Sequence, residues 1–345
     1  MGSILIQNGR IWDGTRFFMG DILTEDGVIA QIAPGISEKA SFTYDAVGKI
    51  VSAGLVDIHM HMHGLSIPQY GICAEAVCFP FGVTAAADAG SRLGDRDTMI
   101  TLKHVVFADT KIENDHLNIP VTQERLSRYG DSAVGLKLFF ASPNITDITP
   151  LREVCDFAGG KKVMVHCNHS PVSMAQIVEM LRPGDILSHV YHGGAHNCLE
   201  SEAFQLAKEK GVVMDTAFAG HVHTDFAVLK RAIAAGMLPD TVSTDITKSS
   251  AFTRGGRYGL TMCMSMAKTA GMTEEDIFRA VTTAPAEALG MDWGRLQVGK
   301  AADIAVLEYA DEGFSLADRA GNVLQSSTGY RCCLTISNGQ VVYKY

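Results

Sequence analysis

From residue 134 onward, short apolar segments alternate with amphipathic ones, and this alternation limits the possible folds more than any other feature of the sequence. The apolar segments predict strands, and the amphipathic segments between them predict helices. The expected strands are 134–140, 162–165, 185–190, 212–215 and 240–244, and the expected helices are 149–158, 173–181, 200–210, 225–235 and 258–270. Apolar strands that alternate with helices indicate a parallel sheet with helices packed on it.

Three further apolar segments precede this region. Segments 55–58 and 83–88 predict strands, and a less regular strand is expected near 103–108. Together they raise the number of strand–helix units to about eight, which is the number that a (β/α)₈ barrel requires. The region 95–118 fits the pattern least well, because its expected helix is short or absent. We therefore predict an α/β fold of the (β/α)₈ TIM-barrel type.

The two ends of the chain have a different pattern, rich in short strands. Asn-Gly and Asp-Gly pairs interrupt both ends, as at Asn338-Gly339. Such dipeptides favour tight hairpin turns. We expect the two ends to pair into a small β-sandwich domain formed by residues 1–52 plus 297–345, which leaves residues 53–296 for the barrel.

The composition is that of an ordinary globular protein. Hydrophobic residues make up 47% of the 345 residues and charged residues 19%, which argues against disorder. The net charge of −9 and the lack of a basic block argue against nucleic acid as a partner. No apolar run is long enough for a membrane span and no signal peptide is visible, so we predict a cytoplasmic protein. The eight scattered cysteines, none in a CxxC pair, predict reduced and mostly buried thiols.

The polar residues that follow the predicted strands carry the functional information, because catalysis in such barrels takes place at the carboxyl ends of the strands. His59 and His61 end the first strand, and residues two apart on a strand point the same way. Such a pair suits a metal, although two surface histidines near a turn would look the same. His166 and His189 each follow a later strand, where a lone histidine is commonly a structural hydrogen-bonding group.

Lys137 and Asp245 are the other two candidates. Lys137 lies in a strongly apolar strand, where its stem can pack while its ammonium group reaches solvent. Alternatively, burial lowers its pKa and leaves a reactive amine that takes up carbon dioxide as a carbamate. Asp245 ends the eighth strand, either as a turn or N-cap residue or as a metal-bound carboxylate that accepts a proton.

Taken together, these residues resemble the amidohydrolase superfamily over nearly the whole chain. The ordered set is His-x-His on strand one, lysine on strand four, histidine on strands five and six, and aspartate on strand eight. The resemblance implies that His59, His61 and Asp245 hold the more buried of two metal ions. It implies that His166 and His189 hold the more exposed one.

The resemblance further implies that carboxylated Lys137 bridges two divalent metal ions. Zn²⁺ is the metal we expect, although histidine and carboxylate ligands also serve manganese, iron and cobalt. The expected mechanism is attack by a hydroxide shared between the metals. Asp245 would accept its proton and then protonate the leaving group.

Segments 183–193 and 238–245 look closer still to a dihydroorotase-like or deacetylase-like subgroup. We therefore expect hydrolysis of an N-acyl or O-acyl bond in a small carboxylic-acid substrate. The alternative is a cyclic amidase of dihydroorotase or hydantoinase type. Dihydroorotases usually read His-x-His-x-Arg, and the matching position here is His63, which weakens that alternative. A third reading is a barrel scaffold without catalysis, against which the complete ligand set argues.

The residues expected to contact substrate come from the loops after the strands. Tyr191, His192, His63, Arg92 and Arg254 are the candidates, and arginine matches a carboxylate with two parallel hydrogen bonds. Packing or a solvated position is the ordinary role of such residues. Four other histidines also lie near strand ends, where hydrogen bonding to the ligands is the ordinary role: His169, His196, His221 and His223. The partners we predict are a small-molecule substrate and a second copy of the chain, with no membrane.

Overall fold

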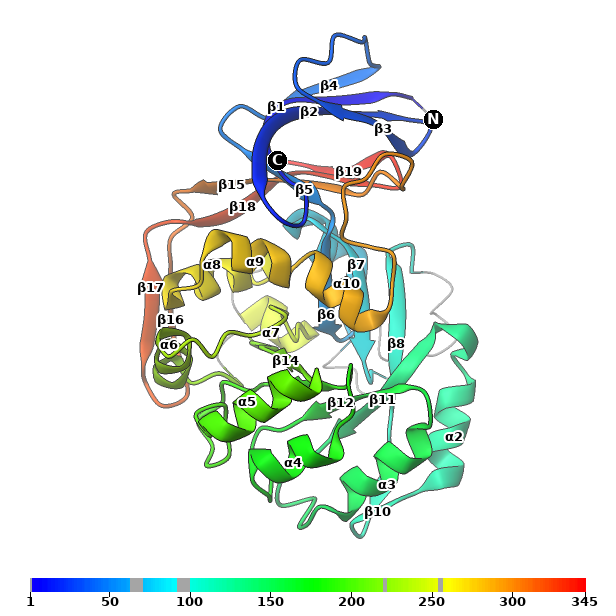
Figure 1. The fold of residues 1–345 in the computed structure, drawn as a ribbon, viewed down its shortest axis with the longest axis vertical. Coiled ribbons are helices and arrows are strands. Elements are labelled where there is room, and N and C mark those ends of the chain that lie inside the picture. The colour runs from blue at the N-terminus through cyan, green and yellow to red at the C-terminus, as the bar shows by residue number, and fades with distance from the viewer. Residues whose placement is uncertain (1, 63–70, 92–99, 220–221, 254–256) are drawn as a thin grey trace.

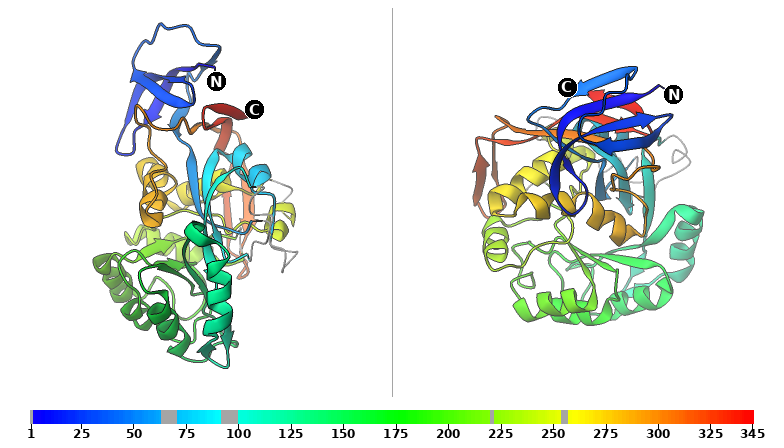
Figure 2. Two further views of the ribbon diagram at one scale, coloured as in Figure 1. Left: turned by 90° about the vertical axis from the view of Figure 1, so that its right-hand side faces the viewer. Right: turned by 45° about the horizontal axis from the view of Figure 1, so that its top comes forward.

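The computed structural model describes residues 2–62, 71–91, 100–219, 222–253 and 257–345. A parallel sheet covered by helices makes up most of it, and a mostly antiparallel sheet built from both ends of the chain lies against one end of this body (Figure 1). Both termini lie in the flanking sheet, far from α3 and α4 (Figures 1 and 2).

The parallel sheet has the strand order β14-β13-β12-β11-β8-β7-β6, so each strand lies beside its neighbour in the sequence. Its strands are β6 (Leu55–Met60), β7 (Val83–Ala89), β8 (Lys103–Asp109), β11 (Ala133–Phe139), β12 (Lys162–His166), β13 (Ile186–Ser188) and β14 (Val213–Asp215). Most residues in these strands are buried, which explains their apolar runs. All seven coincide with segments predicted from the sequence, including the less regular one near 103–108.

The eighth predicted strand, 240–244, is not a regular strand. Thr241 makes one parallel bridge to Asp215 in β14, and Ile246 makes one to Met60 in β6. The segment between them therefore joins the two edges of the sheet by isolated bridges rather than by a continuous ladder. One reason is that the N–H of Thr244 donates to a side chain, Asp57 Oδ1, at 3.1 Å.

Helices follow most of the strands. They are α1 (Ala74–Cys78), α2 (Ile119–Ser127), α3 (Thr149–Ala158), α4 (Met174–Met180), α5 (Ser201–Lys210), α6 (Phe226–Ala234), α7 (Lys248–Thr253), α8 (Leu260–Ala270), α9 (Glu274–Ala280) and α10 (Thr283–Leu289), with 3₁₀ turns η1 (Phe79–Phe81) and η3 (Gly130–Ser132). The predicted helix 149–158 is confirmed residue for residue. The third unit does have a helix, α2, which begins just beyond the region 95–118 and is capped by Asn118. Among the described residues, no helix is long and apolar enough to cross a membrane.

The two ends of the chain meet as predicted. The flanking sheet has the order β19-β18-β15-β5-β1-β2-β3, with β4 paired to β1. Its strands are β1 (Ile4–Trp12), β2 (Phe17–Glu25), β3 (Val28–Ala33), β4 (Phe42–Asp45), β5 (Ile50–Ala53), β15 (Ile304–Ala310), β18 (Gly329–Ser337) and β19 (Gln340–Lys344). Antiparallel pairing of β5 with β15 joins the N-terminal strands to the C-terminal ones.

Two small hairpins complete the fold. β9 (Ile112–Glu113) pairs with β10 (His116–Leu117), and β16 (Phe314–Ala317) pairs with β17 (Val323–Ser326). The second hairpin leaves the flanking sheet and runs along the side of the molecule beside α6 and α8 (Figure 1). All eight cysteines are free thiols and six of them are buried, as the sequence predicts.

Candidate metal centre

The six predicted metal ligands lie together at the carboxyl ends of the parallel strands. His59 belongs to the end of β6 and Lys137 to β11, while His166 ends β12 and His189 follows β13. Asp245 belongs to the segment that joins the two sheet edges, and its N–H donates to the carbonyl oxygen of His59 at 2.7 Å. Parallel strands present their carboxyl ends at one edge, so residues far apart in the sequence converge there.

The first group of side chains surrounds one oxygen of Asp245. Its Oδ1 lies 3.0 Å from His61 Nε2 and 3.5 Å from His59 Nε2. The Nζ atom of Lys137 lies 3.2 Å from the same His59 nitrogen. His59, His189 and Asp245 each offer one ligand atom within 4.8 Å of the others, so these three can share a cation.

The second group consists of three histidines. His166, His189 and His223 also offer ligand atoms within 4.8 Å of one another. The ring centroids of His166 and His189 are 4.3 Å apart, and those of His189 and His223 are 4.5 Å apart. Because His189 belongs to both groups, the two candidate cation sites adjoin. This arrangement is compatible with a two-metal centre.

His223 is a candidate metal ligand that the sequence analysis did not predict, because it gave this residue a hydrogen-bonding role. It lies in the loop after β14, and its Nε2 is 3.7 Å from Asp245 Oδ2. Its Nδ1 lies 2.8 Å from the side-chain amide of Asn168. A half-turn of the Asn168 side chain exchanges its amide nitrogen and oxygen. With the oxygen facing His223, Asn168 accepts a hydrogen bond from Nδ1–H, and the Nε2 atom of His223 is then free to bind a metal.

Polar partners hold the imidazole of His59 in place. His59 Nδ1 lies 3.2 Å from Ser188 Oγ and 3.4 Å from Asp215 Oδ2, so its Nε2 faces Lys137 and Asp245. Asp215 in turn accepts hydrogen bonds at Oδ1 from two hydroxyls of the joining segment. Histidine ligands of metals are oriented in this way through the ring nitrogen that does not bind the metal.

Two more of the strand-end histidines, His61 and His189, are held similarly. His61 Nδ1 lies 3.0 Å from Ser91 Oγ, and His189 Nδ1 donates to the carbonyl oxygen of Ala217 at 2.8 Å. The backbone is also unusual here, because φ is 68° at His189 and 48° at Asp245. Non-glycine residues with positive φ cluster at functional sites, where the surrounding contacts offset the strain.

The buried position of the centre sets its charge states. Burial, reinforced by neighbouring positive groups, lowers the pKa of His59, His166 and His189 well below the usual value. These imidazoles are therefore neutral near pH 7, which is the form that binds metals. Burial also lowers the pKa of Lys137 to about 8, although the carboxylate of Asp245 opposes the shift. Near pH 7 the neutral amine is therefore a minor but accessible form of this lysine.

Asp57 is a positioning residue that sequence reasoning did not single out. Its Oδ1 accepts from the N–H of Thr244, and its Oδ2 accepts from the hydroxyl of Thr244 at 2.6 Å. Burial raises its pKa to about 7. These bonds tie β6, which carries His59, to the segment that carries Asp245. The signal in the sequence was an aspartate inside an otherwise apolar strand.

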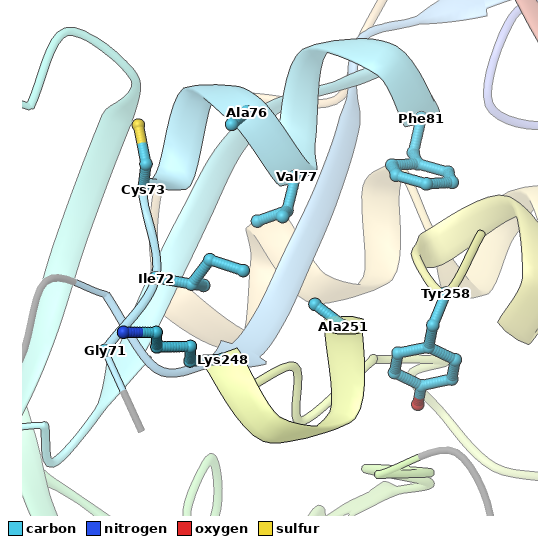
Figure 3. Close-up of a pocket in the computed structure, with 9 residues that line it drawn as sticks. All are labelled: Gly71, Ile72, Cys73, Ala76, Val77, Phe81, Lys248, Ala251 and Tyr258. Carbon is cyan, nitrogen blue, oxygen red and sulfur yellow. The ribbon is translucent and has the colours of Figure 1, made fainter. Parts of the chain in front are cut away.

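Two cavities lie near the centre. An apolar cavity of about 370 Å³ lies between α1 and α7, lined by side chains such as Ile72, Val77 and Ala251 (Figure 3). The N–H of Ile72 donates to the carbonyl oxygen of His61 at 3.2 Å, so this cavity borders the loop after β6. A second cavity of about 260 Å³ is lined in part by His223 and lies on the side of the three-histidine group.

The structure describes only two of the five residues predicted to contact substrate, Tyr191 and His192. Tyr191 is fully buried, and its hydroxyl donates to the carbonyl oxygen of Met237 at 2.8 Å, so it packs rather than facing substrate as predicted. His192 is also buried, and its Nδ1 accepts from the N–H of Gly194. His63, Arg92 and Arg254 lie outside the described residues.

A parallel α/β fold with a cluster of neutral histidines, a lysine and an aspartate at the strand ends defines a candidate metallohydrolase. A model of the amidohydrolase family matches residues 104–342. The chain belongs to the amidohydrolase family, which confirms the prediction of an amidohydrolase-type hydrolase.

Three known proteins show how far this similarity extends. A deacetylase of Enterococcus faecalis is 27% identical over 369 residues, covering 98% of each chain. A deacetylase of Agrobacterium fabrum is 29% identical over 336 residues, covering 86% of this chain and 80% of the relative. The crystal structure of a dihydroorotase superposes with a TM-score of 0.86 at 24% identity, covering 100% of this chain and 98% of that one.

Proposed function

We propose that the protein is a two-metal hydrolase that cleaves the N-acyl or O-acyl bond of a small carboxylic acid. The observation that carries the proposal is the convergence of His59, His189 and Asp245, whose ligand atoms lie within 4.8 Å of one another. Neutral imidazoles and a carboxylate are ligands that suit zinc and related transition metals. The deacetylase relatives match the chain over most of its length, which supports acyl cleavage.

We also propose that the parallel sheet closes into a barrel and that the flanking strands form a β-sandwich. Because 241–246 bridges both β14 and β6, we interpret the parallel sheet as a closed (β/α)₈ barrel of residues 53–296. Residues 1–52 and 297–345 would form the β-sandwich. The apolar cluster that joins Ile6 and Ile22 to Ile304 and Leu334 supports a common core for these two ends. A cytoplasmic location and self-association remain predictions.

The proposed centre holds two divalent ions, for which Zn²⁺ is the expected metal. His59, His61 and Asp245 would bind one ion, and His166 and His189 the other, to which His223 is a further candidate ligand. Lys137, carboxylated by carbon dioxide, would lie between them. Two bound ions supply an acidified water molecule and polarise the scissile carbonyl group.

Asp245 performs the proton transfers in this proposal. Its Oδ1 faces His59 and His61, and its Oδ2 faces His223, so this carboxylate of the first group also faces the second group. It accepts a proton from the attacking water and later delivers it to the leaving group. An amide nitrogen requires that proton more than an alkoxide does, so acyl esters are accessible as additional substrates.

The proposal is tested by hydrolysis assays on the metal-loaded protein. N-acyl amino acids of both configurations, acetylated hydroxy acids, dihydroorotate and hydantoins are compared. We expect turnover of at least one acyclic acyl substrate, with kcat/KM about 10⁴ M⁻¹s⁻¹ or higher and well above that for the rings. Turnover confined to the rings would establish the cyclic amidase instead. If protein that carries two equivalents of metal shows no turnover, the result would support the third alternative, a barrel scaffold without catalysis.

Replacing His223 by alanine tests its place among the ligands. Metal content is expected to fall from about two equivalents to about one, since the second site loses one of its three imidazoles. The matched control is His196→Ala, because His196 is a half-exposed histidine that pairs with Glu200. Elemental analysis after dialysis measures the result. Two equivalents retained with unchanged affinity would remove His223 from the ligand set.

A further inference from the structure

The cavity of about 260 Å³ beside His223 has walls from two distant parts of the chain. His169, His223 and Thr224 come from loops after the parallel strands, while Asp318 and Arg319 come from the turn between β16 and β17. The ring of His223 lies against that of His189, so the cavity adjoins the candidate metal centre. The C-terminal hairpin therefore contributes to the surroundings of the centre.

Hydrogen bonds fix the turn of this hairpin to the start of α6. Asp318 Oδ2 accepts from the N–H of Phe226 at 2.8 Å and from Asn322 Nδ2 at 2.9 Å. Asn322 Nδ2 also lies 3.4 Å from Asp225 Oδ1. Figure 1 shows the hairpin running beside α6. The backbone that carries Arg319 is thus held in one place relative to the cavity.

Arg319 brings a positive charge to this cavity. It forms no hydrogen bond or ion pair with any described residue, and it is exposed. The two carboxylates that share the cavity hydrogen-bond to other groups, because Asp225 Oδ1 caps α6 and both oxygens of Asp318 accept hydrogen bonds. The guanidinium group is therefore available to an anion that enters the cavity.

We propose that Arg319 binds the carboxylate of the substrate and so selects acids among acyl compounds. The inference rests on the proposed function. A guanidinium group presents parallel N–H donors that match the two oxygens of a carboxylate. With the carboxylate held at the hairpin turn, the acyl group of the same molecule lies toward the histidines. The C-terminal flank then determines specificity for a reaction that takes place at the parallel sheet.

Two substrates that differ only in charge test the proposal. N-acetylalanine, in both configurations, is compared with N-acetylalaninamide, and release of acetate is measured. In Arg319→Ala, kcat/KM for the acid is expected to fall about 10- to 100-fold, mainly through KM, while that for the amide changes less than about 3-fold. Arg319→Lys should recover part of the loss, because lysine restores the positive charge but not the pair of parallel N–H donors. An equal loss on both substrates, or none on either, would overturn the assignment.

A control variant and a binding measurement complete the experiment. Arg16→Ala removes the same charge from a highly exposed position in the N-terminal flank. It should leave kcat/KM unchanged for both substrates. Calorimetry of N-acetylalanine binding to the metal-loaded protein should show Kd raised by a similar factor in Arg319→Ala. If the wild type hydrolyses neither compound, the proposed function is judged by the wider substrate panel, and this binding assay still decides the role of Arg319. Weaker binding in the variant would support it, and equal binding or none in the wild type would overturn it.

Discussion

Replacing Lys137 by alanine is expected to lower kcat/KM by about 10³-fold or more and to reduce the bound metal below two equivalents. The side chain is almost completely buried in β11, and its Nζ lies 3.2 Å from His59 Nε2. An ammonium ion in that position is costly, and burial lowers the pKa of Lys137 to about 8. The neutral amine can form a carbamate, whose two oxygens would hold the metals together.

Chemical rescue separates this role from a loss of folding. Lys137→Ala leaves a space where a short carboxylate such as acetate or propionate can enter, so added carboxylate should restore part of the metal content and activity. The control is Lys111→Ala, because Lys111 is a half-exposed lysine whose ammonium group pairs with Glu113 at 3.4 Å. Full activity of Lys137→Ala without additives would show that no bridging group is needed at this position.

The strand ends could be predicted from the sequence because their pattern is local. An apolar run of fixed length predicts a buried strand, and the polar residue that follows it must lie at the carboxyl edge of the sheet. The pattern predicts His166 and His189 in this way, because each directly follows an apolar strand. It also predicts Lys137, which lies inside such a strand. The structure brings all three together with His59 and Asp245.

Other features depended on contacts that no local pattern encodes. His223 lies eight residues beyond the end of β14, in a loop without periodicity, so its position could not be inferred from spacing. Arg319 belongs to a hairpin more than seventy residues after Asp245, and long-range bonds such as those from Phe226 to Asp318 and from Asn322 to Asp225 bring that hairpin to the cavity. The irregular segment 240–246 likewise depends on Asp57, which takes the N–H of Thr244.

Asp245→Asn is expected to retain both metals while kcat/KM for an amide substrate falls by about 10³- to 10⁴-fold. Asparagine keeps an oxygen in the same place and tolerates the backbone φ of 48° as readily as aspartate does. It cannot accept the proton of the attacking water or deliver one to the leaving nitrogen. The matched control is Asp292→Asn, which removes one negative charge from an exposed residue that pairs with Lys300.

The leaving group distinguishes proton transfer from metal binding at Asp245. An acyl ester of an acidic phenol departs without being protonated, so Asp245→Asn should slow its hydrolysis less than it slows that of the amide. A residue that served only as a metal ligand would slow both substrates equally, because both carbonyl groups depend on the metals. Unequal losses with unchanged metal content therefore identify the carboxylate as the proton carrier, and equal losses would assign Asp245 to metal binding alone.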